Sequence, residues 1–172
     1  MHLEPAQSAD LPALHDLIES AYRGDSAKLG WTHEADLLGG QRTDMEALEA
    51  MLADPAQTIL ILRDGEEIDA CVALADRGGG LTYIGMFTVV PSRQATGVGR
   101  LLLAASEEHA ASAFDATRIE MTVIAQRSEL IAWYERRGYH LTGERRPFPA
   151  NDPRFGLPKR EDLEFVVLAK ML

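Results

Sequence analysis

Two glycines, Gly97 and Gly99, stand between an apolar segment and a helical pattern in the run from Phe87 to Arg100. Glycine lets a ligand approach the backbone closely, because it has no side chain and tolerates left-handed dihedral angles. The first turn of a helix has free N–H groups and the positive end of the helix dipole, and both attract anions. The spacing therefore predicts a loop that binds a phosphate group.

Two common nucleotide-binding motifs do not fit this loop. The third glycine of the dinucleotide fingerprint is missing after Gly99, and no Gly-Lys-Ser/Thr follows as a P-loop requires. The remaining pattern runs from Gln94 to Gly99, and the residues alone leave the kind of phosphate open.

A second candidate for chemistry is Tyr134, which stands beside Trp133 in the run from Glu129 to Tyr139. A phenol hydroxyl can donate a proton during a reaction. Taken alone, the pattern favours the simpler interpretation that Tyr134 packs one face of a helix.

The order of strands and helices must place these residues. Apolar periodicity predicts helices over residues 8–22, with Ser8 as N-cap, over 43–53, after the glycine loop, and over 128–137. Strands are predicted over residues 2–5, 58–63, 68–75, 81–90, 118–124, 139–142 and 163–169. Residues 23–41 are predicted to be irregular or a broken helix. The order β-α-α-β-β-β-α-β-α-β-β indicates one α+β domain over residues 1–172, because three strands follow one another without a helix.

Composition narrows the function classes. The chain has 172 residues, with 17 Lys and Arg against 27 Asp and Glu and a net charge of −10, which argues against a nucleic-acid partner. No apolar run approaches the roughly 18 residues of a membrane span. The first residues lack the regions of a signal peptide, so we expect a cytoplasmic protein. The single cysteine, Cys71, lies in an apolar run and is expected to be a core residue. A homodimer is only the commonest default.

The two motifs together resemble a known family. Residues 94–99 resemble the Q/R-x-x-G-x-G/A pyrophosphate loop of the GNAT N-acetyltransferase superfamily, and residues 129–139 resemble its second signature, a helix with an acyl-transfer tyrosine that closes on Gly-Tyr. The element order matches over nearly the whole chain. The resemblance implies a mixed, mostly antiparallel sheet flanked by helices. It also implies acetyl-CoA as cosubstrate, no metal, and transfer to a primary amine of a small molecule by direct attack in a ternary complex.

The resemblance also assigns residues to the cofactor. Phe87, Thr88 and Val89 match the strand that pairs with the pantetheine arm, and a bulge there would splay the sheet. The backbone of the loop would hold the pyrophosphate, with Arg93 and Arg100 either adding charge or merely solvated; the loop residues are Gln94, Ala95, Thr96, Gly97, Val98 and Gly99.

The resemblance assigns the catalytic groups as well. The backbone amide of Val89 would stabilise the oxyanion, and Tyr134 would protonate the leaving thiolate. Arg127 stands where the family often has an asparagine that contacts the cofactor. A guanidinium there is still expected to reach a cofactor carbonyl or phosphate.

The general base stays open among several groups. Glu120, Glu34 and His33 are candidates, and water relayed by Tyr83 or Thr82 is the alternative.

Charge is segregated between two irregular segments. Residues 25–54 hold seven acidic against two basic side chains, and residues 143–160 hold five basic against two acidic ones. One hypothesis is that the acidic side receives the amine while the basic loop contacts a carboxylate or phosphate of the same acceptor, such as an amino acid or short peptide. Two solvated loops are the alternative. Two other functions also fit: a non-catalytic acyl-CoA-binding sensor, and a protein or peptide N-acetyltransferase.

Overall fold

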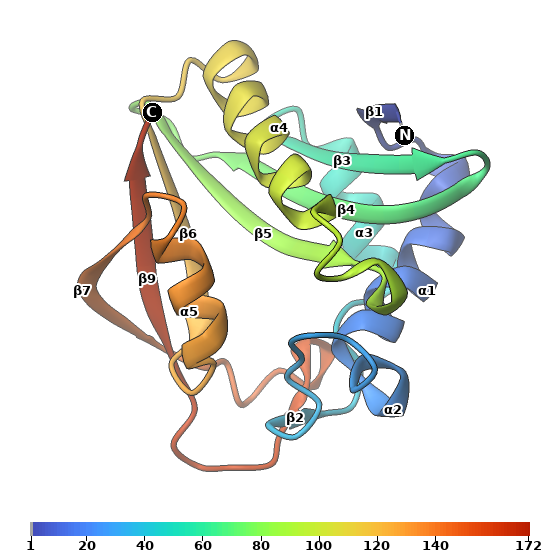
Figure 1. Ribbon diagram of the computed structural model, residues 1–172, viewed down its shortest axis with the longest axis vertical. Helices are drawn as coiled ribbons and strands as arrows, with labels where there is room; N and C mark the ends of the chain where they lie inside the picture. Colours follow the sequence, from blue (N-terminus) through green and yellow to red (C-terminus); the bar gives the residue numbers. More distant parts are fainter. Residues whose placement is uncertain (1) are drawn as a thin grey trace.

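A computed structural model describes residues 2–172, with the backbone alone for Phe155 (Figure 1). Seven strands form a sheet in the order β1-β3-β4-β5-β6-β9-β7. They are β1 (His2–Pro5), β3 (Gln57–Asp64), β4 (Glu67–Asp76), β5 (Leu81–Val89), β6 (Arg118–Ile124), β7 (His140–Pro147) and β9 (Glu164–Met171). Only β5 and β6 pair in parallel. The expected mixed, mostly antiparallel sheet is therefore confirmed.

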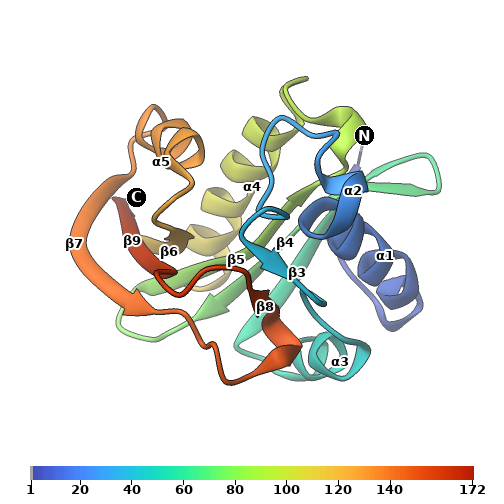
Figure 2. The same ribbon diagram turned by 90° about the horizontal axis from the view of Figure 1, so that it is seen from below.

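Helices cover both faces of this sheet, as Figure 2 shows. Helices α4 (Val98–Ala113) and α5 (Ser128–Glu135) lie on one face, and α1 (Leu11–Tyr22) and α3 (Met45–Ala53) on the other. Successive residues of β3 point to opposite faces of the sheet and pack in two separate hydrophobic cores. Leu60 and Leu62 belong to the core that includes α4. Ile59 and Ile61 belong to the core that includes α1. No helix within residues 2–172 has the length and apolar character to cross a bilayer.

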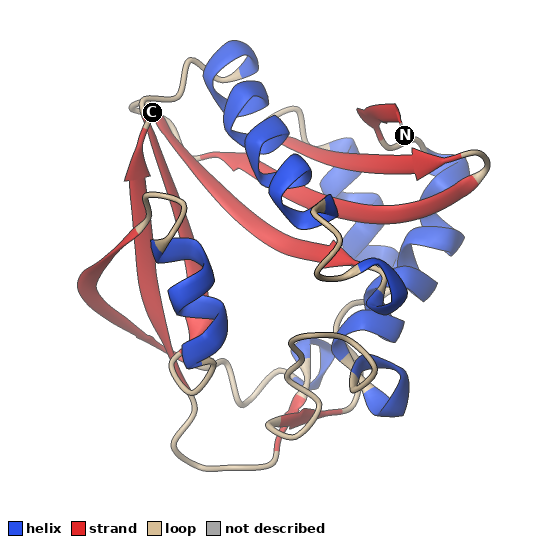
Figure 3. Ribbon diagram, viewed as in Figure 1, coloured by secondary structure: helices blue, strands red, loops and turns tan. Residues whose placement is uncertain are grey.

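Two segments expected to be irregular meet in a small second sheet. Strand β2 (Leu38–Gly39) pairs antiparallel with β8 (Leu157–Pro158), although more than a hundred residues separate them in sequence. Residues 23–44, which also contain the short helix α2 (Gly24–Ala27), and residues 148–163 are drawn largely as loops in Figure 3 and meet at this sheet. Strands of two residues are too short to show a periodicity, so the sequence could not predict them.

Several element ends differ from the predicted ones. Helix α1 begins at Leu11, because Ser8–Asp10 forms a 3-10 turn that Gln7, not Ser8, precedes as cap. Strand β7 continues to Pro147 instead of ending at residue 142. Nearly all of its side chains are exposed, so its sequence lacks the alternation that marks a half-buried strand.

Strands β5 and β6 separate after four paired residues. Parallel pairing runs from Leu81 opposite Arg118 to Ile84 opposite Met121 and then stops. At that point β5 shifts register against β4, and Met86 adopts a left-handed φ of 47°. A bulge of this kind bends its strand and increases its twist. The bulge expected on β5 is therefore present, and beyond it the strands diverge.

Leu168 on β9 is fully buried between β6 and β7, so it tests the account of the core. Leu168→Ala should lower the free energy of unfolding by about 2–5 kcal/mol, because it removes buried methyl groups and leaves a cavity. Urea denaturation measures this change. The control Leu29→Ala removes a side chain that is 82% exposed and should change stability by about 0.5 kcal/mol or less. Equal effects of the two substitutions would contradict the assigned core.

Candidate functional site

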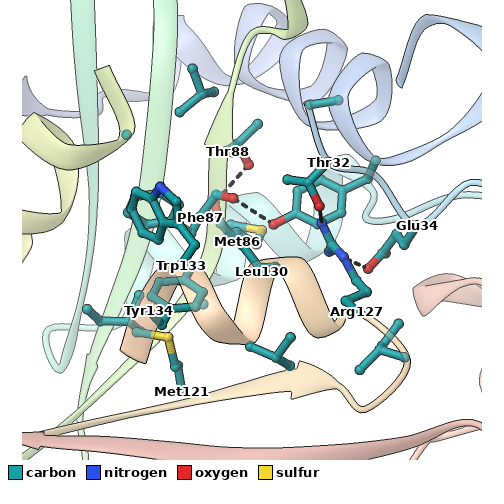
Figure 4. A pocket seen from close by; sticks show the side chains of 18 of the residues that line it. Thr32, Glu34, Met86, Phe87, Thr88, Met121, Arg127, Leu130, Trp133 and Tyr134 are labelled. Atoms are coloured by element: carbon teal, nitrogen blue, oxygen red, sulfur yellow. Dashed lines mark hydrogen bonds and ion pairs between the residues drawn. The ribbon is translucent and has the colours of Figure 1, made fainter. Parts of the chain in front are cut away.

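A cavity of about 720 Å³ opens where β5 and β6 diverge. This volume lies in the range of small-molecule sites. Its walls come from the diverging halves of both strands, the glycine loop, the start of α4, α5, and parts of the segments 21–42 and 148–165. Figure 4 shows Phe87 on β5 with Trp133 and Tyr134 to one side and Arg127, Glu34 and Thr32 to the other.

The glycine loop has the geometry of an anion site. Gly97 is the N-cap of α4 with a φ of 99°, and Ala95 is also left-handed, with a φ of 62°. Left-handed residues in a turn direct successive N–H groups into a concave surface, and the first N–H groups of α4 have no partner within the helix. Gly99 lies close to α5, since a Cβ there would stand 3.5 Å from a ring carbon of Trp133.

Not every residue assigned to the loop faces the cavity. Gln94, Ala95, Thr96, Gly97, Gly99 and Arg100 line it, whereas the Val98 side chain is buried in the core, which leaves only its backbone for a ligand. Arg93, which was expected either to add charge toward a phosphate or to be solvated, does not line the cavity. Its guanidinium group binds Asp69 at 3.0 Å and also pairs with Asp64.

Gln94 connects the loop to two other segments. Its Nε2 donates to the Val89 carbonyl oxygen at 3.1 Å, and its Oε1 accepts a hydrogen bond from the Thr32 backbone N–H at 3.3 Å. The side chain thus fixes the end of β5 relative to residues 30–32. Gln94 has a positioning role that the sequence motif does not show.

Strand β5 turns an unpaired backbone edge toward the cavity. The Val90 N–H donates to the Asp69 carbonyl oxygen on β4 at 2.8 Å. Because successive N–H groups of a strand point to opposite edges, the Val89 N–H points away from β4 toward the diverging side. The Phe87 carbonyl oxygen accepts a hydrogen bond from the Tyr22 hydroxyl at 2.8 Å. The Thr88 hydroxyl is used locally, since it donates to the Met86 carbonyl oxygen.

Tyr134 lines the cavity from α5 and is 4% exposed. Its ring contacts those of Phe87, Trp133 and Tyr139 at centroid distances of 5.0–6.2 Å. No residue in the described part of the chain hydrogen-bonds to its hydroxyl. Burial raises the pKa of Tyr134 above its ordinary value, so the hydroxyl keeps its proton at neutral pH. The cavity therefore contains a protonated phenol with an available donor.

A buried ion-pair cluster joins residues 23–34 to the start of α5. Glu34 accepts hydrogen bonds from Arg23 Nη1 at 2.5 Å and from Arg127 Nη1 at 3.2 Å. Arg127 Nη2 also donates to the Thr32 hydroxyl at 3.0 Å. Figure 4 shows Arg127 and Glu34 facing each other. Arg127 also lines the cavity, and its Nε is buried with no partner among the described residues.

The structure separates the candidate bases. Of the carboxylates and histidines in residues 2–172, Glu34 alone lines the cavity, and guanidinium groups occupy both its oxygens. Glu120 lies outside the cavity lining and pairs with Arg118 at 2.5 Å and Arg146 at 3.5 Å. The structure therefore does not bring Glu120 to Tyr134, contrary to the expectation for a base.

The remaining base candidates differ in their access to the cavity. His33 and Thr82 do not line it. Tyr83 does, and its hydroxyl lies 2.6 Å from Thr122 Oγ1 at the point where the strands part.

The charged residues of the basic segment 143–160 do not line the cavity. Phe148 and Pro149 are the segment's only lining residues within the described chain. Its cations have partners elsewhere: Arg145 pairs with Glu164, Arg146 with Glu144, Arg154 with Asp152, Arg160 with Asp162, and Lys159 donates to the Ala35 carbonyl oxygen. The hypothesis that this loop contacts an acceptor anion therefore gains no support from its charged residues.

Sequence reasoning also missed lining residues. Tyr22 falls within the predicted helix 8–22, and Arg42 is one of two basic residues in the acidic segment 25–54, yet both line the cavity. Their places in the cavity depend on how the segment 23–44 folds back, and no local pattern shows this.

The buried cluster predicts a strong effect of Glu34→Gln on stability. The substitution leaves two buried guanidinium groups facing a neutral amide, and we expect a loss of roughly 3 kcal/mol or more. Chemical denaturation measures the loss. Asp162→Asn breaks the exposed pair with Arg160 and should cost about 1 kcal/mol or less. A Glu34→Gln protein as stable as the Asp162→Asn protein would contradict a structural role for the cluster.

The sequence matches the model of a known protein family. Residues 32–149 match the family model of the acetyltransferase (GNAT) domain. A search of curated proteins gave no match.

Solved structures share the fold at low sequence identity. The ribosomal-protein-alanine N-acetyltransferase from Brucella melitensis has a TM-score of 0.73 at 16% identity, with 100% of both chains covered. A GNAT family acetyltransferase from Elizabethkingia anophelis with acetyl-CoA bound has a TM-score of 0.68 at 15% identity, with 99% of this chain and 97% of that chain covered. A spermidine N-acetyltransferase variant from Vibrio cholerae has a TM-score of 0.70 at 13% identity, with 99% and 95% covered. Because the family model spans more than half of the sequence and the fold agrees, the chain belongs to the GNAT family of acetyltransferases.

Proposed function

We propose that this protein is an acetyl-CoA-dependent N-acetyltransferase that transfers the acetyl group to the primary amine of a small molecule in a ternary complex, with residues 1–172 acting as one domain. The observation that carries the proposal is the cavity between β5 and β6. It combines an anion-binding loop, an unpaired strand edge and a protonated tyrosine.

The residues around the cavity fit acetyl-CoA. N–H groups of residues 95–99 suit the pyrophosphate, with Arg100 and Arg137 as the cations that line the cavity on the α4 and α5 side. The edge of β5 from Phe87 to Val89 has carbonyl oxygens that already accept from Tyr22 and Gln94, so it offers its N–H groups to the amide carbonyls of the pantetheine arm. The solved neighbour with acetyl-CoA bound supports the choice of ligand.

The chain's own groups suit the steps of acyl transfer. Acetyl-CoA supplies a thioester whose carbonyl carbon an amine nitrogen can attack, with loss of the thiol. The Val89 N–H would stabilise the negative charge that develops on the carbonyl oxygen. The Tyr134 hydroxyl would give its proton to the leaving sulfur. With Glu34 held by two arginines, we assign the amine's proton to water near Tyr83.

The walls of the cavity favour a small acceptor over a protein chain. The β2–β8 sheet joins residues 23–44 to residues 148–163, and Leu38 and Phe148 from these segments line the cavity. Two segments tied together in this way narrow access from that side. A non-catalytic acyl-CoA sensor has the same cofactor residues, but it has no need of the protonated Tyr134.

Tyr134→Phe removes the proposed proton donor and keeps the ring packing. We expect kcat to fall by about 100-fold and KM for acetyl-CoA to change by about twofold or less, because the lost interaction belongs to the transition state. Free-thiol release from acetyl-CoA with an amine panel measures both constants. Since burial raises the pKa of Tyr134, the hydroxyl stays protonated at mildly alkaline pH, so the wild-type rate should not fall there.

The outcomes of this experiment separate the alternatives. An equally fast Tyr134→Phe enzyme would show that Tyr134 is not the acid. Tight binding of acetyl-CoA without thiol release for any amine would favour the sensor and contradict the proposed enzyme.

Gly97→Ala tests the loop, because Gly97 has a φ of 99°. A side chain there costs about 1–2 kcal/mol in the left-handed conformation, and the loop must return to that conformation to bind. We expect the Kd for coenzyme A to rise roughly 5- to 30-fold. Gly65 has a φ of 68° in a hairpin turn outside the cavity lining, so Gly65→Ala is a matched control. Calorimetric titration should find its Kd unchanged. An unchanged Kd for Gly97→Ala would reject the loop as the anion site.

A further inference from the structure

Four arginines of the described chain line the cavity: Arg42, Arg100, Arg127 and Arg137. Arg100 lies in the first turn of α4, and Arg137, which follows α5, lies over the Trp133 ring that faces Gly99, so both are on the side of the glycine loop. Arg42 comes from the segment between α1 and α3 and lies against Glu19 and Tyr22 of α1. If the cofactor occupies the loop side, Arg42 belongs to the side from which the acceptor enters.

Arg42 differs from Arg127, which also lines the cavity. No carboxylate within residues 2–172 forms an ion pair with its guanidinium group, whereas Glu34 neutralises Arg127. The Arg42 side chain is half-buried and lies over the Tyr22 ring, with 5.0 Å between the guanidinium carbon and the ring centre. Its backbone is fixed, because its N–H donates to Glu19 at 2.7 Å. A positioned guanidinium group with no protein anion suits an anion from a ligand.

Tyr22 links Arg42 to the reacting strand. Its hydroxyl binds the Phe87 carbonyl oxygen at 2.8 Å, and its ring lies beneath Arg42. An anion bound by Arg42 therefore lies about one tyrosine ring from the strand on which the thioester is proposed to sit. That separation suits an amine and a carboxylate held on the same carbon atom or a few bonds apart.

Another part of the cavity lining is apolar. Leu38 and Ile124 belong to a buried cluster against which Phe148 and Phe165 pack, and the two phenylalanine rings lie 5.5 Å apart. All four line the cavity. A polyamine would need carboxylates here for its further charges, yet Glu34 is the only lining carboxylate among the described residues and two arginines hold it.

We infer that the acceptor is an apolar α-amino acid whose carboxylate binds the Arg42 guanidinium group and whose side group packs against Leu38, Ile124, Phe148 and Phe165. This inference rests on the proposed acetyltransferase function. It assigns the recognition of the acceptor anion to the acidic segment 25–54, not to the basic segment 143–160.

The test compares matched acceptors on matched variants. L-phenylalanine and L-leucine are each compared with the amine that lacks the carboxylate, phenethylamine and isopentylamine, by thiol release from acetyl-CoA. In the wild type, kcat/KM for the amino acid should exceed that for its amine by about tenfold or more. Arg42→Gln should lower this ratio by about 10- to 100-fold while KM for acetyl-CoA stays near the wild-type value. Arg160→Gln, which removes a cation of the basic segment, should keep the wild-type ratio.

Each outcome decides the inference. The inference would be overturned by a wild-type ratio of amino acid to amine near one, or by a ratio that Arg42→Gln does not change. In either case, thiol release from the plain amines would leave the proposed acetyltransferase function standing. Absence of thiol release with every amine would overturn the function and this inference together. If Arg42→Gln does not fold, Arg42→Lys takes its place, because lysine cannot reproduce the planar guanidinium group. An Arg42→Lys ratio equal to that of the wild type would then contradict recognition of the carboxylate by this guanidinium group.

Discussion

The structure depends on the end of parallel pairing between β5 and β6 after Ile84 and Met121. Backbone N–H and C=O groups need partners, so a strand that loses its neighbour in the middle of a sheet needs substitutes. Tyr22 and Gln94 satisfy the carbonyl oxygens of Phe87 and Val89 on this edge. The Val89 N–H points to the same edge and faces the space between the strands. The divergence thus creates both the cavity and the hydrogen-bonding edge that a ligand can use.

The buried ion pairs of Glu34 with Arg23 and Arg127 hold the segment 23–44, which forms part of the cavity wall, in place. Burying three charged groups is costly, and an apolar replacement can be as stable. The cluster nevertheless fixes the segment 23–44 to the start of α5, the helix that carries Tyr134. Because this segment is fixed, Arg42 lines the cavity, while Glu34 neutralises Arg23 and Arg127. Four arginines and one glutamate among the described residues line the cavity, so its charge differs in sign from the net charge of −10 of the chain.

The sequence predicted the parts of this site that lie within one element or one turn. Gly97 and the strand before it indicated the loop, and the apolar runs separated by turn glycines indicated the meander of β3 to β5, because local geometry determines such patterns. The pairing of Leu38 with Pro158 and the burial of Glu34 depend on contacts between distant segments, which no periodicity records. For the same reason Glu120 was expected in the cavity, although it pairs with Arg118 and Arg146 outside it.

The most direct test of the account is a crystal structure of the protein with acetyl-CoA. The account predicts the pyrophosphate on the N–H groups of residues 95–99 and the pantetheine arm between β5 and β6. It also predicts the thioester oxygen within hydrogen-bonding distance of the Val89 N–H and the sulfur beside the Tyr134 hydroxyl. A cofactor bound outside this cavity, or a thioester directed away from Val89 and Tyr134, would contradict it.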